Sequence, residues 1–183
     1  MEPPGITRHR RPFLAPLWLS LAAAFAVGGI AWVFYRSSTT TLVIMVRPDE
    51  KDAGKIEDPP LSPEGEEGAG RLAHIFGDTR GAGGIDVVYA SDDRRARQTA
   101  APLVERVRRA LVVFSAADAQ ATAARALREH CGGTVLVVAS GAALPRMMRE
   151  LTGSDVDSAP YDAVIYLISI PTLGRAHLVQ LRF

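Results

Sequence analysis

The sequence predicts an α/β domain, a three-layer α/β/α sandwich with a mostly parallel sheet, preceded by one N-terminal transmembrane helix. Two observations lead to this expectation. An uncharged apolar run fills residues 13–35, and the rest of the 183-residue chain alternates short apolar runs with segments of helical periodicity. Strands that alternate with helices pair in parallel through right-handed crossovers, which leaves helices on both faces of the sheet.

The apolar run from Phe13 to Tyr35 contains 23 residues, enough to cross a bilayer as a helix. The arginines clustered before it predict that residues 1–12 form a basic N-terminus in the cytoplasm and that the C-terminal domain is exported. We therefore expect an uncleaved signal anchor, in a single-pass protein of a bacterial inner membrane with its domain on the periplasmic side. A cleavable signal peptide ending near Ala24-Phe25-Ala26 is the alternative, but the apolar run continues beyond it.

Composition excludes several other classes of protein. Four of the 21 basic residues and one of the 20 acidic residues lie in the first 36 positions, so the domain is faintly acidic and gives no sign of nucleic-acid binding. A single cysteine, Cys131, rules out an internal disulfide. The four histidines are scattered, so no metal site is expected, and no cofactor is predicted.

The domain is expected over residues 42–183, after a linker at 36–41. Its strands are short, continuous apolar runs, as in strands buried on both faces of a parallel sheet. The last two runs are joined by Pro171–Gly174 and are expected to form a hairpin. The expected strands are 42–46, 85–89, 111–114, 134–138, 163–170 and 177–183.

Helices are expected between these strands. Ser62 is predicted to cap the first helix, with Pro63 in its first turn. Ser91 is predicted to cap the second, with Asp92 and Asp93 in a first turn where the helix dipole favours carboxylates. Besides the helix that Ser91 caps, the expected helices are 62–76, 118–130 and 142–151.

Binding sites in folds of this class lie beyond the C-terminal ends of the strands. Three segments occupy such places here: Arg47-Pro48-Asp49-Glu50, Ser91 to Arg97, and Ala139-Ser140-Gly141. We therefore expect the functional site to be built from these three segments.

Four stretches of the domain follow one another in the order of four known signatures. They are Leu42 to Lys51, which contains Arg47-Pro48; Leu61-Ser62-Pro63-Glu64-Gly65; Tyr89 to Ala100, which contains Arg95-Ala96-Arg97-Gln98-Thr99-Ala100; and Val135 to Pro145, which contains Ala139-Ser140-Gly141. Together they resemble the histidine phosphatase superfamily, also called phosphoglycerate mutase-like. The resemblance implies a phosphoglycerate mutase-like fold and a phosphate-binding site in which Arg47 and Arg95 match the arginines that grip phosphate.

The resemblance also implies that both catalytic histidines of the family are missing. Pro48 stands at the position of the nucleophilic histidine and Ser140 at that of the second histidine. The family's covalent chemistry needs an imidazole that attacks phosphorus, and a proline cannot attack. A serine cannot supply a cationic donor to the developing phosphoryl charge. No catalytic residue is therefore expected at either position.

These departures predict a membrane-anchored pseudoenzyme, a pseudophosphatase that binds a phosphorylated small molecule, a phosphoprotein or another protein partner. One alternative is an active phosphatase, a phosphomonoester hydrolase with a substitute nucleophile; Asp49 and Ser140 are the candidate residues. A second alternative is a structural subunit of a membrane assembly. In that case Arg47 and Arg95 would be solvated or paired with neighbouring carboxylates.

Overall fold

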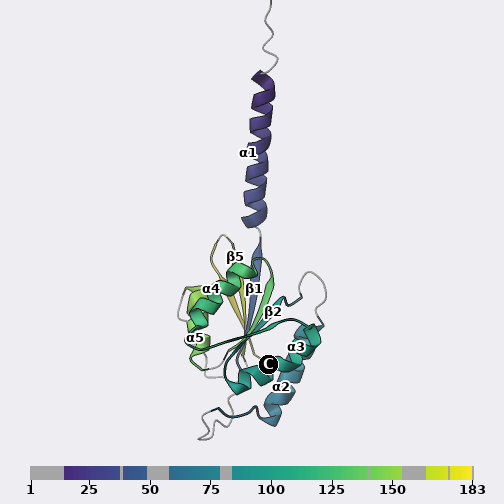
Figure 1. Ribbon diagram of the computed structural model, residues 1–183, viewed down its shortest axis with the longest axis vertical. Coiled ribbons are helices and arrows are strands. Elements are labelled where there is room, and N and C mark those ends of the chain that lie inside the picture. Colours follow the sequence, from purple (N-terminus) through teal and green to yellow (C-terminus); the bar gives the residue numbers. More distant parts are fainter. Residues whose placement is uncertain are drawn as a thin grey trace, which may run out of the picture. The chain divides into compact units, whose positions relative to one another are not determined.

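The computed structural model describes residues 15–37, 39–48, 58–78, 84–139, 141–153, 164–172 and 174–182. The chain divides into two compact units, Met1–Ser37 and Ser38–Phe183. Among the described residues, the first unit holds one helix, α1, and the second holds six strands and four helices (Figure 1).

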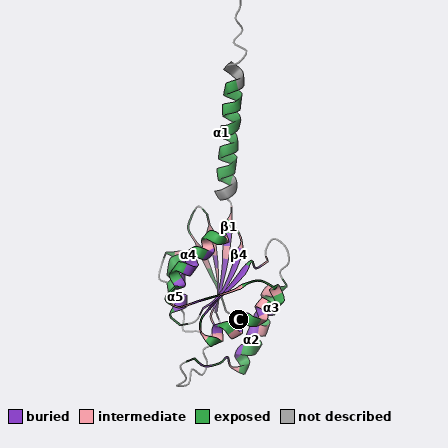
Figure 2. Cartoon of the chain, in the orientation of Figure 1, coloured by how far each residue is buried: buried purple, intermediate pink, exposed green. Residues whose placement is uncertain are grey.

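α1 spans Ala15–Ser37, so the helix expected at this place in the chain is confirmed. Every side chain described in it, from Trp18 to Phe34, is exposed (Figure 2). Trp18 and Phe25 are about four-fifths exposed, at 80% and 77%. Within the part of the chain that the structure describes, no helix combines the length and the apolar character that a membrane span needs. The predicted transmembrane span is thus not confirmed.

The second unit is built on one six-stranded sheet with the order β3-β2-β4-β1-β5-β6. The first four strands in that order are parallel to their neighbours, whereas β5 runs antiparallel to β1 and forms a hairpin with β6. The expected mostly parallel sheet and the terminal hairpin are therefore confirmed. The strands are β1 (Thr40–Val46), β2 (Val87–Ser91), β3 (Leu111–Phe114), β4 (Thr134–Val138), β5 (Val164–Pro171) and β6 (His177–Arg182).

Helices cover both faces of this sheet, as a three-layer sandwich requires (Figure 1). Side chains alternate along each strand, so Val43 and Met45 of β1 pack under α4 and α5, while Ile44 and Val46 pack under α2 and α3. Each face thus has its own apolar core. The helices are α2 (Pro63–Gly77), α3 (Arg94–Val107), α4 (Ala119–Glu129) and α5 (Ala143–Thr152).

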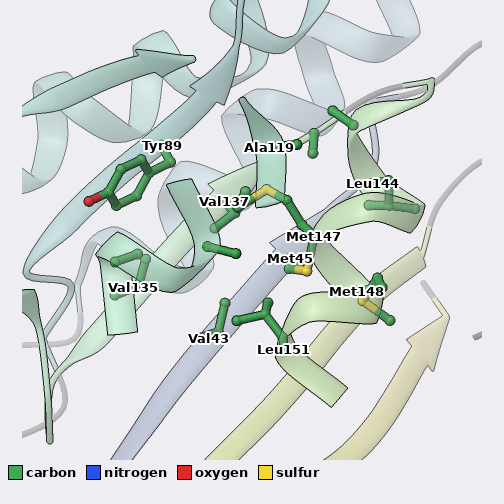
Figure 3. Close-up of a cluster of buried hydrophobic side chains, with 14 of the residues drawn as sticks. Val43, Met45, Tyr89, Ala119, Val135, Val137, Leu144, Met147, Met148 and Leu151 are labelled. Atoms are coloured by element: carbon green, nitrogen blue, oxygen red, sulfur yellow. The ribbon is translucent and has the colours of Figure 1, made fainter. Parts of the chain in front are cut away.

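The core under α4 and α5 contains the largest buried side chains (Figure 3). Tyr89, Met45 and Met147 are each at most 1% exposed. Burial raises the pKa of the Tyr89 phenol, and a hydrogen bond from Arg125 and its positive charge partly oppose the rise. The Tyr89 ring also meets His130 edge-on at 6.5 Å between centroids, which ties β2 to the end of α4.

The start of β2 differs from the expectation at a pair of hydrogen bonds to β4. β2 begins at Val87 rather than Ile85. Asp86, just before it, forms hydrogen bonds to Thr134, the first residue of β4. The Asp86 carboxylate accepts from Thr134 N at 2.9 Å, and Asp86 N donates to Thr134 O at 2.9 Å. The apolar pattern alone could not place the strand, because Ile85 is buried like the strand residues that follow.

Candidate functional site

The C-terminal ends of the four parallel strands meet at one edge of the sheet. Val46 of β1 and Ala90 of β2 both pair with Val138 of β4, which lies between them. Ala139 N donates to Val46 O at 3.1 Å just beyond the paired residues. The structure therefore brings the described parts of the three predicted segments to the same edge.

At the end of β1, Arg47 is half-buried and Pro48 is buried. Arg47 N donates to Val164 O of β5 at 3.5 Å. Pro48 has no N–H to donate, so it ends the backbone ladder at this point. The other candidates from the sequence, Asp49 and Ser140, lie outside the described residues.

The turn from β2 to α3 is held by Asp93 and corrects one expectation. Ser91 is the last residue of β2, and its buried hydroxyl donates to Asp93 Oδ2 at 2.5 Å. Asp93 Oδ1 accepts from Ala96 N at 3.0 Å, so Asp93 caps α3. The prediction that Ser91 caps this helix was wrong. Serine and aspartate are both good caps, and β2 continues two residues beyond the expected Tyr89.

Arg95 lies in the first turn of α3, beside this cap, and is half-buried. Its Nε is fully buried, yet it has no hydrogen-bond partner among the described residues. A buried donor without an acceptor costs about 1–3 kcal/mol, more when it is charged. An anion at this place would remove that cost. Arg94 and Arg97 of the same turn are exposed.

Two further residues support the site and were not singled out from the sequence. Asp58 Oδ1 accepts from Arg94 N at 2.9 Å, and Gln98 Oε1 accepts from Leu61 N at 2.8 Å. Both bonds fasten the segment before α2 to the first turns of α3. In the sequence, only the order of the four motif stretches indicated that the segment before α2 and the start of α3 form part of one site.

The arrangement of this edge suits an anion. β1 and β2 are separated by β4, so their ends lie two strand spacings apart, roughly 10 Å. Arg47 directly follows β1, and Arg95 lies in the first turn of α3, which follows β2. The N-terminus of α3 adds the positive end of a helix dipole. The described residues contain no cluster of side chains that could hold a metal ion.

Comparison with known proteins gives the same fold. Residues 47–118 match the model of the histidine phosphatase superfamily (branch 1). Curated protein sequences give no match. The structure is similar to that of a mycobacterial glucosyl-3-phosphoglycerate phosphatase, with a TM-score of 0.59 and 18% identity over 76% of this chain and 97% of that one.

Two other solved structures extend this comparison. The protein histidine phosphatase SixA, complexed with tungstate, has a TM-score of 0.59 and 15% identity, over 77% of this chain and 96% of its own. A phosphoglycerate mutase from Bacillus anthracis has a TM-score of 0.54 and 17% identity, over 80% and 95%. At such identities the likeness establishes the fold, so the expected phosphoglycerate mutase-like fold is confirmed for the domain.

Proposed function

We propose that the domain, whose residues 47–118 match the model of the histidine phosphatase superfamily, binds a phosphorylated ligand at the C-terminal edge of the sheet without transferring the phosphoryl group. The observation that carries this proposal is the buried Nε of Arg95, which has no hydrogen-bond partner among the described residues. This N–H donor belongs to a charged guanidinium and is buried from water. It lies at the end of the sheet where the sequence resemblance implies a phosphate-binding site.

The absence of turnover follows from the chemistry of two side chains. The resemblance assigns the nucleophile's position to Pro48, whose nitrogen belongs to a tertiary amide and has no lone pair with which to attack phosphorus. It assigns the second histidine's position to Ser140, which cannot carry a positive charge. A phosphohistidine can therefore neither form nor be stabilised here by the family's route.

The remaining groups suffice for binding. A guanidinium presents a planar fork of N–H donors that matches the oxygens of a phosphate, and it stays charged at every physiological pH. Arg47 and Arg95 belong to different strand ends, so a ligand held by both would be fixed in position as well as neutralised. This supports recognition of a phosphorylated small molecule or phosphoprotein.

The test measures turnover and binding on the full chain in detergent. We expect no hydrolysis of para-nitrophenyl phosphate above that of the Arg95→Ala variant. Inorganic phosphate at a hundredfold excess over its Kd should stabilise the wild type by about 2.7 kcal/mol. That raises the Tm by roughly 5–10 °C for a domain of this size.

Two variants on one helix make the binding result specific. Arg95→Ala should abolish the phosphate-dependent rise in Tm, whereas Arg97→Ala, which removes an exposed arginine two residues away, should keep it. A wild type that phosphate does not stabilise contradicts the proposal and favours the structural-subunit alternative.

A working phosphatase is the second candidate, because two of the similar structures are named as phosphatases. Turnover that Arg95→Ala abolishes would establish it, and loss of that turnover in Asp49→Asn or Ser140→Ala would identify the substitute nucleophile. Turnover that is equal in wild type and Arg95→Ala would instead indicate a contaminant.

We also propose that the N-terminal run anchors the domain to a membrane with the domain on the exported side. The uncharged residues 13–35 and the exposure of every described side chain of α1 support this. Apolar side chains that face outward all around a helix need an apolar environment.

A further inference from the structure

The first turn of α3 brings positive and negative side chains together in equal number. The helix carries three arginines there, and three carboxylates lie beside it. The arginines are Arg94, Arg95 and Arg97, and the carboxylates are Asp58, Asp92 and Asp93. A site for a ligand with negative charge alone is expected to carry an excess of cations. The balance of charges at this turn instead favours a ligand that carries both signs.

Asp58 presents its carboxylate to this turn from a rigid segment. Its Oδ1 accepts from Arg94 N at 2.9 Å. The next two residues are prolines, whose rings fix φ, and the first of them is buried. Leu61 N then donates to Gln98 Oε1 at 2.8 Å, which ties the same segment to α3 a second time. The carboxylate is therefore held in position before a ligand arrives.

The Asp58 carboxylate can still accept further hydrogen bonds. An ionised carboxylate has about four lone-pair sites, and Arg94 N fills one of them. Within the part of the chain that the structure describes, Asp58 Oδ2 has no partner of its own. Asp58 is also exposed, so a cationic group of a ligand can reach it from solution.

The other two carboxylates of the turn are less suited to bind a ligand. Both oxygens of Asp93 are engaged, one by the Ser91 hydroxyl and the other by Ala96 N. Asp92 is exposed, and its backbone N–H donates to Phe114 O. No contact with the described residues orients the Asp92 carboxylate. Asp58 is thus the carboxylate that is both oriented and open.

Asp58 and Arg95 carry opposite charges at one turn without forming an ion pair. The Asp58 carboxylate binds N of Arg94, whose Cα lies about 3.8 Å from that of Arg95. Counting only the described residues, Arg95 has no carboxylate partner and its buried Nε has no acceptor. One molecule with a phosphate at one end and an ammonium at the other can satisfy both side chains.

We propose that the ligand of this site is a zwitterionic phosphate ester, whose phosphate binds Arg95 and whose ammonium, on a short carbon chain, binds Asp58. This inference rests on the phosphate binding proposed above and narrows it to one class of ligand. The phosphate gives the Arg95 Nε the acceptor that it lacks. The ammonium has three donors, and its hydrogen bonds to a carboxylate are charge-assisted.

Two ligands that differ in one group test the proposal on the full chain in detergent. Phosphoethanolamine and propyl phosphate have the same phosphate and nearly the same shape, but the first ends in an ammonium and the second in a methyl group. Isothermal titration should give phosphoethanolamine a dissociation constant at least about threefold lower, because only its ammonium can pair with Asp58.

Asp58→Asn separates the charge of this side chain from its structural role, because the amide oxygen can still accept from Arg94 N. The variant should bind phosphoethanolamine more weakly, since the ammonium loses its partner. It should bind propyl phosphate more tightly, since a negative charge near the phosphate is gone. Structural damage to the site would weaken the binding of both ligands.

Asp92→Asn is the matched control. It removes the other exposed carboxylate of the same turn and should keep the preference for phosphoethanolamine. A third ligand, glycerophosphoethanolamine, carries the same ammonium on the diester of a lipid headgroup. If it binds more tightly than phosphoethanolamine, the source of the ligand is a lipid headgroup. If it binds more weakly, the source is a free amine phosphate.

Three results would overturn the proposal: equal affinities of the wild type for phosphoethanolamine and propyl phosphate, a preference that Asp58→Asn keeps, or a preference that only Asp92→Asn removes. If inorganic phosphate still stabilises the wild type in any of these cases, the phosphate site stands and the selectivity for an ammonium is wrong. If none of the phosphates binds, both proposals fail together.

Discussion

At the scale of single residues, Asp93 stabilises the turn on which the candidate site depends. One of its carboxylate oxygens caps α3 and the other accepts the buried hydroxyl of Ser91. The N-terminal turn of α3 carries Arg95, so the orientation of that arginine depends on this cap. The neighbouring Asp92 is exposed, and its backbone N–H donates to Phe114 O.

Replacing Asp93 by alanine should lower the free energy of unfolding by about 1–2 kcal/mol, because it removes a helix cap and an acceptor for a buried hydroxyl. Urea unfolding of the full chain measures the change. Asp92→Ala should stay within about 0.5 kcal/mol of the wild type. Equal losses in the two variants would mean that Asp93 does not cap α3.

At the scale of elements, the sequence was sufficient to predict that strands and helices alternate and where α2 begins. Ser62 accepts from Gly65 N at 3.1 Å and Pro63 opens the helix, as predicted. The cap of α3 was misplaced because three polar residues in succession can all cap a helix. The order of the strands could not be predicted either, since β1 pairs with β4 and β5, far along the chain.

Two glycines of α2, Gly65 and Gly70, differ in the space around them, so alanine at the two positions should change the stability of the protein in opposite directions. A Cβ on Gly70 meets nothing within 4 Å, so Gly70→Ala should stabilise the protein by about 0.5–1 kcal/mol through helix propensity. A Cβ on Gly65 would lie 2.8 Å from Leu61 Cγ, closer than side chains pack. Leu61 is buried, so Gly65→Ala should lower the Tm.

Thermal unfolding of both alanine variants checks this difference within one helix. A Gly65→Ala variant as stable as Gly70→Ala would show that Leu61 can move at little cost. The contact between the start of α2 and α3 would then be looser than the bond from Leu61 N to Gln98 implies.

At the scale of the whole molecule, the chain combines a compact domain with a helix that buries none of its described side chains. The sequence predicted where the site lies, because parallel strands end at one edge. It could not show that the Arg95 Nε is buried with no partner in the described part of the chain, since burial depends on how α3 packs. Asp49 and Ser140 lie outside the described residues, so their roles remain predictions.

The anchoring proposal predicts how the full chain fractionates in cells that express it. It should stay in the membrane pellet after washing with high salt and with alkaline carbonate, and detergent should release it, because about 20 apolar residues hold a helix in lipid effectively irreversibly. A chain without residues 1–36 should be recovered in the soluble fraction. Release of the full chain by carbonate would contradict the anchor.

The place of β1 in the sheet also governs when the domain can fold. Of the described strands, β1 is the first to be synthesised, but its two neighbours are β4 and β5, which begin at Thr134 and Val164. Pairing over such sequence separations slows folding, because the chain must close long loops first. During synthesis, the apolar residues 42–46 therefore stay without their sheet neighbours until β4 and β5 have been made, and in that interval they can be bound by chaperones.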